Sequence, residues 1–133
     1  MQFEPHGDYL LWTKGDVLYA KLIDAWNKEA AVKFSIEFKE LAKTFSGDWG
    51  HFVDLTEWDL CNAEVFGIVK DLVDWCIANG LTRAAQVYPP SIIKAQFVDQ
   101  MVVEEFGGFK RAVFGSNENA CDWLTAQGFA AEI

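Results

Sequence analysis

The chain has 133 residues, 51% of them hydrophobic and 15% aromatic, so it can form one globular domain over 1–133 with a full core. Its formal net charge of −9 disfavours nucleic acid and anionic lipid as partners, because both are negatively charged. Three cysteines and two histidines match no zinc or redox motif, so we expect no metal and no cofactor. Without a basic and apolar leader or a membrane-length apolar run, we expect a cytoplasmic protein.

The N-terminal part of the chain predicts a β-hairpin followed by a helix. Two strands, Tyr9–Thr13 and Val17–Ile23, flank Gly15, which tolerates the positive φ angle of a tight turn. Asn27 can cap the helix, because its side-chain oxygen can accept a hydrogen bond from a first-turn N–H. The apolar residues that recur at helical spacing are Ala31, Phe34, Phe38, Leu41, Ala42 and Phe45.

The rest of the chain alternates between strand and helix patterns. We expect strands at Gly50–Leu55, Arg83–Tyr88 and Arg111–Phe114, and helices capped by Asn62, Ser91 and Ser116. The inner face of the helix after Asn62 would consist of Val65, Val69, Leu72, Val73 and Cys76. This order predicts an α/β fold with four helices and a mixed, mostly parallel five-stranded sheet, because a helix is needed to return the chain to a parallel strand.

A polar stretch between Thr56 and Asn62 follows the third predicted strand. We interpret Thr56 as a residue that ends the strand by bonding loop backbone, with modification of its hydroxyl as the alternative. Asp54, Glu57 and Asp59 are either an acid/base cluster or a solvated acidic rim. The rim is the better interpretation, because no base partner stands near them in the sequence.

Besides Asp54, two residues are candidates for catalysis, and neither is convincing. Cys61 precedes a helix, where a thiolate is favoured, but no His or Lys adjoins it in sequence. His51 could serve as a general base, although a lone histidine is more often structural. We therefore expect no enzyme.

The predicted helix Ile92–Phe106 carries two apolar stripes. One consists of Ile92, Ala95, Val98, Val102, Val103 and Phe106, and the other of Ile93, Phe97 and Met101. A helix that rests on a sheet needs only one stripe. The second either packs on a neighbouring helix or forms a lid over an apolar ligand, the seam of a homodimer, or a patch that touches a bilayer.

Several segments resemble one family over nearly the whole chain. The element order, the DAWN sequence, the WGHFVDLTEW strand and the NACDWL helix start resemble the SpoIIAA-like (STAS/SEC14-like) proteins, which are related to anti-sigma factor antagonists. The phosphorylatable antagonists carry Asp-Ser-Ser-Gly at a helix start, where this chain has Asn62-Ala63-Glu64-Val65. The phosphorylation switch is therefore expected to be absent. Glu64 either mimics a phosphate or, as we prefer, complements the helix dipole.

The resemblance also implies a function. SEC14-like relatives bind lipids or other nonpolar molecules between a sheet and a mobile helix, so helix Ile92–Phe106 would gate an apolar pocket. The candidate ligand-binding residues are Trp58, Ile93, Phe97, Met101, Phe106 and Phe109. The alternative is a protein-interaction regulator that docks a protein partner through a loop containing Asp54, Thr56, Glu57, Asn62 and Glu64.

Overall fold

The fold is described from a computed structural model, which defines residues 4–59, 62–89, 92–99 and 105–133. The side chains of Ile92, Ile93, Lys94 and Phe97 are not among the described parts. The elements are β1 (Asp8–Lys14), β2 (Val17–Asp24), α1 (Lys28–Ala42), β3 (Trp49–Trp58), α2 (Ala63–Ala78), β4 (Leu81–Val87), α3 (Ile92–Asp99), β5 (Glu105–Phe106), β6 (Phe109–Phe114) and α4 (Asn117–Ala126).

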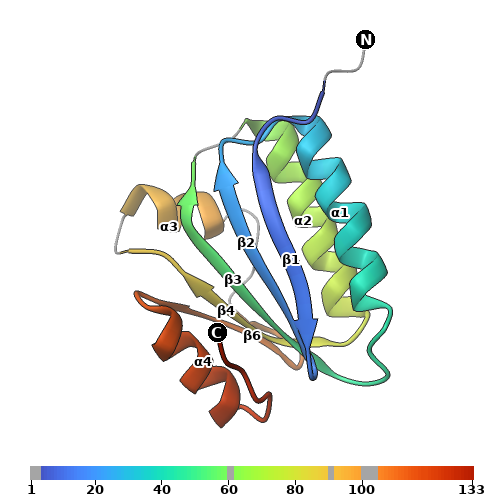
Figure 1. The fold of residues 1–133 in the computed structure, drawn as a ribbon, viewed down its shortest axis with the longest axis vertical. Coiled ribbons are helices and arrows are strands. Elements are labelled where there is room, and N and C mark those ends of the chain that lie inside the picture. The colour runs from blue at the N-terminus through green and yellow to red at the C-terminus, as the bar shows by residue number, and fades with distance from the viewer. Residues whose placement is uncertain (1–3, 60–61, 90–91, 100–104) are drawn as a thin grey trace.

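The strands form one six-stranded sheet in the order β1-β2-β3-β4-β6-β5 (Figure 1). The central strands β2, β3, β4 and β6 run parallel, and the edge strands β1 and β5 pair antiparallel with their neighbours. The predicted mixed, mostly parallel α/β sheet is confirmed, and the two-residue β5 adds a sixth strand. No helix in the described ranges combines the length and apolar character needed to cross a membrane.

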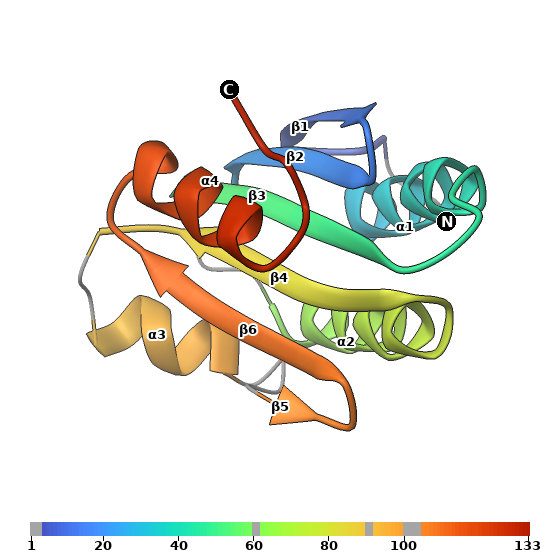
Figure 2. The same cartoon turned by 90° about the horizontal axis from the view of Figure 1, so that it is seen from below.

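Helices cover both faces of the sheet, with α1 and α2 on one side and α4 on the other (Figures 1 and 2). Residues of β2 alternate between the two cores, as the period of a strand requires. Leu18, Ala20 and Leu22 pack in the larger core beneath α1 and α2. Val17 and Tyr19 pack in the smaller core beneath α4. The larger core also receives Val98 of α3, so α3 belongs to the same face as α1 and α2.

Three predicted helix caps are confirmed. The side-chain oxygens of Asn27, Asn62 and Ser116 accept hydrogen bonds from first-turn N–H groups of α1, α2 and α4. Ser91, the fourth predicted cap, lies outside the described residues. At the hairpin, Gly15 has a φ of 59°, the left-handed conformation expected for the turn between β1 and β2.

The predicted helix Ile92–Phe106 is wrong in its C-terminal part. The helix α3 is described to Asp99, and Glu105–Phe106 form a strand in which Phe106 pairs with Phe109. Gly107, with a φ of 58°, supplies the turn of this short hairpin. Hydrogen bonding along the free edge of β6 therefore overrides the helical pattern there, and Phe106 does not continue a helical stripe.

The third strand extends further than predicted, to Trp58 instead of Leu55. Thr56 and Glu57 consequently belong to the strand and not to a loop. Asp54 pairs with Lys21 and Glu57 pairs with Ile23, so β3 holds one extra residue at this point and forms a bulge. The Thr56 N–H donates to the Asp54 carboxylate at 2.9 Å within the bulge.

Candidate functional site

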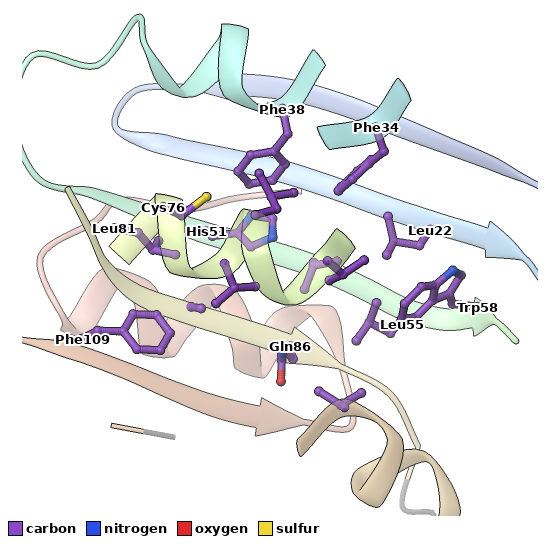
Figure 3. Close-up of a pocket in the computed structure, with 16 residues that line it drawn as sticks. Leu22, Phe34, Phe38, His51, Leu55, Trp58, Cys76, Leu81, Gln86 and Phe109 are labelled. Atoms are coloured by element: carbon purple, nitrogen blue, oxygen red, sulfur yellow. The ribbon is translucent and has the colours of Figure 1, made fainter. Parts of the chain in front are cut away.

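An apolar cavity of about 70 Å³ lies inside the larger core, between the sheet and the helices α1, α2 and α3 (Figure 3). Its wall combines side chains from four strands and three helices. Apart from the Trp58 indole and the Cys76 thiol, His51 and Gln86 are the lining residues with polar side-chain atoms among those described. The cavity therefore offers space for a molecule without offering much hydrogen bonding.

The volume limits what the cavity can hold as it stands. A buried water needs roughly 10–15 Å³ of cavity volume and two to four polar partners. Most of this wall is apolar and offers no such partners. Engineered apolar cavities of about 150 Å³ stay dry and bind benzene. A cavity of about 70 Å³ suits a short hydrocarbon segment, and a longer chain must displace part of the wall.

Aromatic rings form the part of the wall beneath α1. The Phe34 and Phe38 ring centroids lie 5.5 Å apart, and Phe34 packs on Trp26 at 4.9 Å. Trp26 meets Trp58 edge-on at 5.4 Å, and Trp58 lines the cavity from β3. Edge-on and tilted contacts are the favourable arrangements for aromatic rings. The aromatic surplus of the sequence thus serves the core and the cavity wall together.

His51 is a neutral structural residue inside the larger core. Its Nδ1 donates to the carbonyl oxygen of Leu18 at 2.7 Å, and its ring meets Phe38 edge-on at 5.0 Å. Burial lowers the pKa of His51 to about 4, because the charged imidazolium would lose its hydration. A group that stays uncharged at pH 7 keeps the cavity apolar, which agrees with the structural interpretation of this histidine.

A polar cluster lies at the α3 end of the cavity. Arg111 of β6 donates from Nη1 to Gln86 Oε1 at 2.9 Å and from Nη2 to Asp99 Oδ1 at 2.6 Å. The Arg111 side chain is only 2% exposed, whereas the Asp99 side chain is 56% exposed. This cluster was not predicted from the sequence. The available signal was a charged residue two positions after Phe109, on the inward face of the same strand.

The candidate ligand-binding residues are distributed unevenly around the cavity. Trp58 and Phe109 line it, whereas Phe106 is 67% exposed on β5 and is not part of the wall. Met101 and the side chains of Ile93 and Phe97 lie outside the described residues. The aliphatic part of the wall, which the sequence analysis did not assign to a site, includes Leu22, Val53, Leu55, Val69, Leu72, Val73, Leu81, Ala84 and Val98.

The predicted partner-docking residues lie at the C-terminal end of β3 and the first turn of α2. Thr56, Glu57, Asn62 and Glu64 are exposed, and Asp54 is half-buried. Glu57 forms an ion pair with Lys21 of β2, with an N–O distance of 2.6 Å. Asn62 is occupied as the cap of α2. These residues are therefore a strand end and a helix start, and Glu64 is an exposed carboxylate in the first turn of α2, where it complements the helix dipole.

Neither described cysteine has the environment of a nucleophile. Burial raises the pKa of Cys76 to about 12, and burial also raises the pKa of Cys121. Cys61 lies outside the described residues. Within the described part of the chain, no three His, Cys, Asp or Glu side chains are grouped so that they could hold a metal ion.

Comparison with solved structures shows that the fold is SpoIIAA-like. One similar structure is an uncharacterized protein from the DUF3478 family with a SpoIIAA-like fold from Shewanella loihica PV-4. It has 14% sequence identity and a TM-score of 0.64, over 93% of this chain and 98% of that chain. Another is the anti-sigma factor antagonist SpoIIAA in its unphosphorylated form, with 11% identity and a TM-score of 0.60, over 89% of this chain and 98% of that chain.

Other comparisons add no nearer relative. No protein-family model matches the chain, and no curated protein matches it. The SpoIIAA-like fold expected from the sequence is thus confirmed at the level of architecture, across nearly the full length of both solved chains. At these identities the likeness establishes the fold alone.

Proposed function

We propose that this SpoIIAA-like domain is a non-catalytic binding protein for a nonpolar small molecule or lipid. The observation that carries the proposal is the apolar cavity between the sheet and the helices α1, α2 and α3. Ligand sites are typically concave, mostly apolar and lined by aromatic side chains with a few polar groups. The wall of this cavity has that composition, with His51 held neutral and Gln86 at one end.

The free energy of the cavity favours a ligand. A void left in a core costs roughly 24 cal/mol per Å³, so about 70 Å³ costs roughly 2 kcal/mol. An apolar molecule that fills the space restores dispersion contacts with the wall and recovers part of that cost. A core that served only for packing would be expected to close such a space with one larger side chain.

In this proposal α3 is the gate of the cavity. The described side chains that hold it to the core are Val98, which is 1% exposed and lines the cavity, Ala95, which is partly buried against the same core, and Asp99, which pairs with Arg111. The Asp99 side chain is 56% exposed, so water competes with Arg111 for this contact and the ion pair is a weak anchor. Displacement of α3 would enlarge the space enough for a longer acyl chain.

The experiment titrates the purified protein with 1-octanol, a neutral apolar probe, and follows binding by NMR shifts of core methyl groups. Val69→Phe places a ring in the cavity wall, and Val32→Phe makes the same change at an α1 position that is 40% exposed. Wild type and Val32→Phe should saturate, and folded Val69→Phe should not. Absence of saturable binding in wild type, or unchanged binding by folded Val69→Phe, would overturn the proposal.

The proposal includes contact with a lipid surface through exposed apolar side chains. Phe106 is 67% exposed on β5 and Val113 is 44% exposed on the adjacent β6. The net charge of −9 restricts this contact to zwitterionic lipid. Phosphatidylcholine vesicles should retain wild-type protein in a flotation assay and lose Phe106→Ser. Equal flotation of the two proteins would remove the membrane contact from the proposal.

A second candidate function is a protein-interaction regulator of the anti-sigma factor antagonist type. The observation that favours it is the fold likeness to the antagonist SpoIIAA over 89% of this chain. Docking would use the exposed end of β3 and start of α2, with Glu64 as the central charge. A specific partner should be captured by wild type and by Glu118→Lys, which alters the first turn of α4, but not by Glu64→Lys. Loss of capture in both variants, or in neither, would argue against this surface.

A further inference from the structure

The Arg111 guanidinium is a buried cation beside an apolar cavity. Its side chain is 2% exposed, and it lies on the sheet face that α1, α2 and α3 cover. A buried charge is costly unless an opposite charge and hydrogen-bond partners accompany it. A packed scaffold gains little from such a residue, because an apolar side chain of similar volume is often as stable at a buried site.

The Asp99 carboxylate that pairs with Arg111 is about half exposed to solvent. Asp99 accepts from Arg111 Nη2 at 2.6 Å, yet its side chain is 56% exposed. Water therefore competes with Arg111 for this carboxylate, which weakens the ion pair. Asp99 can therefore leave the pair and be hydrated at low cost, provided that another anion takes its place on Arg111.

Neighbours of this ion pair line the cavity, although Arg111 and Asp99 themselves do not. Gln86 lines the cavity (Figure 3). Its Oε1 accepts a hydrogen bond from Arg111 Nη1 at 2.9 Å. Val98, the neighbour of Asp99 in sequence, and Phe109, two residues before Arg111, also line it. Gln86 thus links the apolar space to the buried cation at the end of the cavity that α3 covers.

We infer that the ligand of this cavity is an amphipathic carboxylate, of the fatty acid class, whose carboxylate binds Arg111 in place of Asp99. This inference rests on the proposed binding function and specifies its ligand class. The hydrocarbon chain occupies the cavity, and the carboxylate meets the guanidinium in the two-pronged geometry that both groups favour. One carboxylate replaces another, so the buried charge stays paired while Asp99 moves into water. The same exchange removes the ion pair between Asp99 of α3 and Arg111, which couples ligand entry to displacement of the gate.

The test compares octanoate with 1-octanol, which has the same chain length and no charge, by calorimetric titration at pH 7. Asp99→Asn leaves Arg111 without its competing carboxylate, so octanoate affinity should rise at least tenfold while octanol affinity stays unchanged. Asp74→Asn is the matched control. Asp74 is 57% exposed and pairs with Lys70 on the surface of α2. The Asp74→Asn substitution changes the net charge by the same amount as Asp99→Asn. This control should leave both affinities at their wild-type values.

A second variant tests the cation directly. Arg111→Met keeps the apolar volume and removes the charge, so octanoate should bind no more tightly than octanol. If Arg111→Met does not fold, Asp99→Asn decides alone. Octanol binding with no gain in octanoate affinity in Asp99→Asn would overturn the inference and leave the proposed function standing. If neither octanoate nor octanol binds to wild type or to Asp99→Asn, both the inference and the proposed function are wrong. An equal gain in octanoate affinity in Asp74→Asn would show that the effect comes from the change in net charge alone, and it would also overturn the inference.

Discussion

His51 donates a hydrogen bond from Nδ1 to the carbonyl oxygen of Leu18 at 2.7 Å, which joins the side chain of β3 to the backbone of β2 within the larger core. This bond requires the proton on Nδ1, because a carbonyl oxygen can only accept. The neutral ring is thus part of the packing between the sheet and Phe38, which meets it edge-on.

The first prediction concerns the pH dependence of stability. The pKa of His51 is about 4 in the folded protein, below its ordinary value of 6.5, so the unfolded chain binds the proton more readily. The stabilising effect of the neutral ring is therefore fully present above pH 6.5 and is lost as the pH falls towards 4. The complete loss amounts to about 3 kcal/mol.

Urea unfolding at pH 7 and pH 4.5 measures this contribution. His51→Gln keeps an N–H donor for Leu18 but cannot be protonated, so its stability should fall less between the two pH values than that of wild type. Equal losses in the two proteins would show that carboxylates elsewhere, and not His51, govern acid unfolding.

The second prediction uses two adjacent alanines that face opposite cores. Ala84 lines the cavity, and Ala85 packs beneath α4 in the smaller core. Ala84→Val adds two carbons to empty space and should stabilise the fold by about 1 kcal/mol. Ala85→Val adds the same atoms where the core is closed, and should destabilise it by about 1–3 kcal/mol. Urea midpoints provide the measurement, and destabilisation by both substitutions would contradict the location of the cavity.

The third prediction compares two helix caps. Asn27 and Asn62 each accept a hydrogen bond from a first-turn N–H, and removal of such a cap costs about 1 kcal/mol. Asn27 also accepts from the His6 N–H and donates to the Glu4 carbonyl oxygen, at 2.9 and 2.8 Å. Asn27→Ala should therefore destabilise the protein by about 1 kcal/mol more than Asn62→Ala in thermal unfolding. Equal losses would mean that the segment before β1 contributes nothing to stability.

The fourth prediction concerns the thiol in the cavity wall. The pKa of Cys76 is raised to about 12, so its thiolate is roughly a thousandfold scarcer at neutral pH than that of an ordinary cysteine. With Cys61 and Cys121 both replaced by serine, Cys76 should react with Ellman's reagent only as fast as the protein unfolds. Rapid labelling under native conditions would contradict the burial of this thiol in the cavity wall.

Local signals allowed much of the architecture to be predicted from the sequence. The caps at Asn27, Asn62 and Ser116 depend on contacts with residues three positions further along the chain, so the sequence around them contains the information. The strand and helix periods likewise repeat over short distances, and they placed Phe34 and Phe38 correctly in the core.

Longer-range pairing decided the places where these expectations failed. Phe106 fits a helical stripe by spacing, but it pairs with Phe109 at the free edge of the sheet. Thr56 and Glu57 look like loop residues, but pairing with β2 keeps them in β3 across a bulge. Hydrogen bonds between strands outweigh weak local preferences, and no short window of sequence contains both partners.

The sequence by itself determined the strand and helix order apart from β5, three of the caps and most of the apolar faces, because each depends on neighbours within one or two turns. Only the tertiary structure decided where a cavity remains and that Arg111, Gln86 and Asp99 meet at its end. These three residues come from β6, β4 and α3, and the cavity is the space that side chains from seven elements leave unfilled. The size and place of such a space depend on how side chains from different layers pack against one another. The periodicity of one segment does not contain that information.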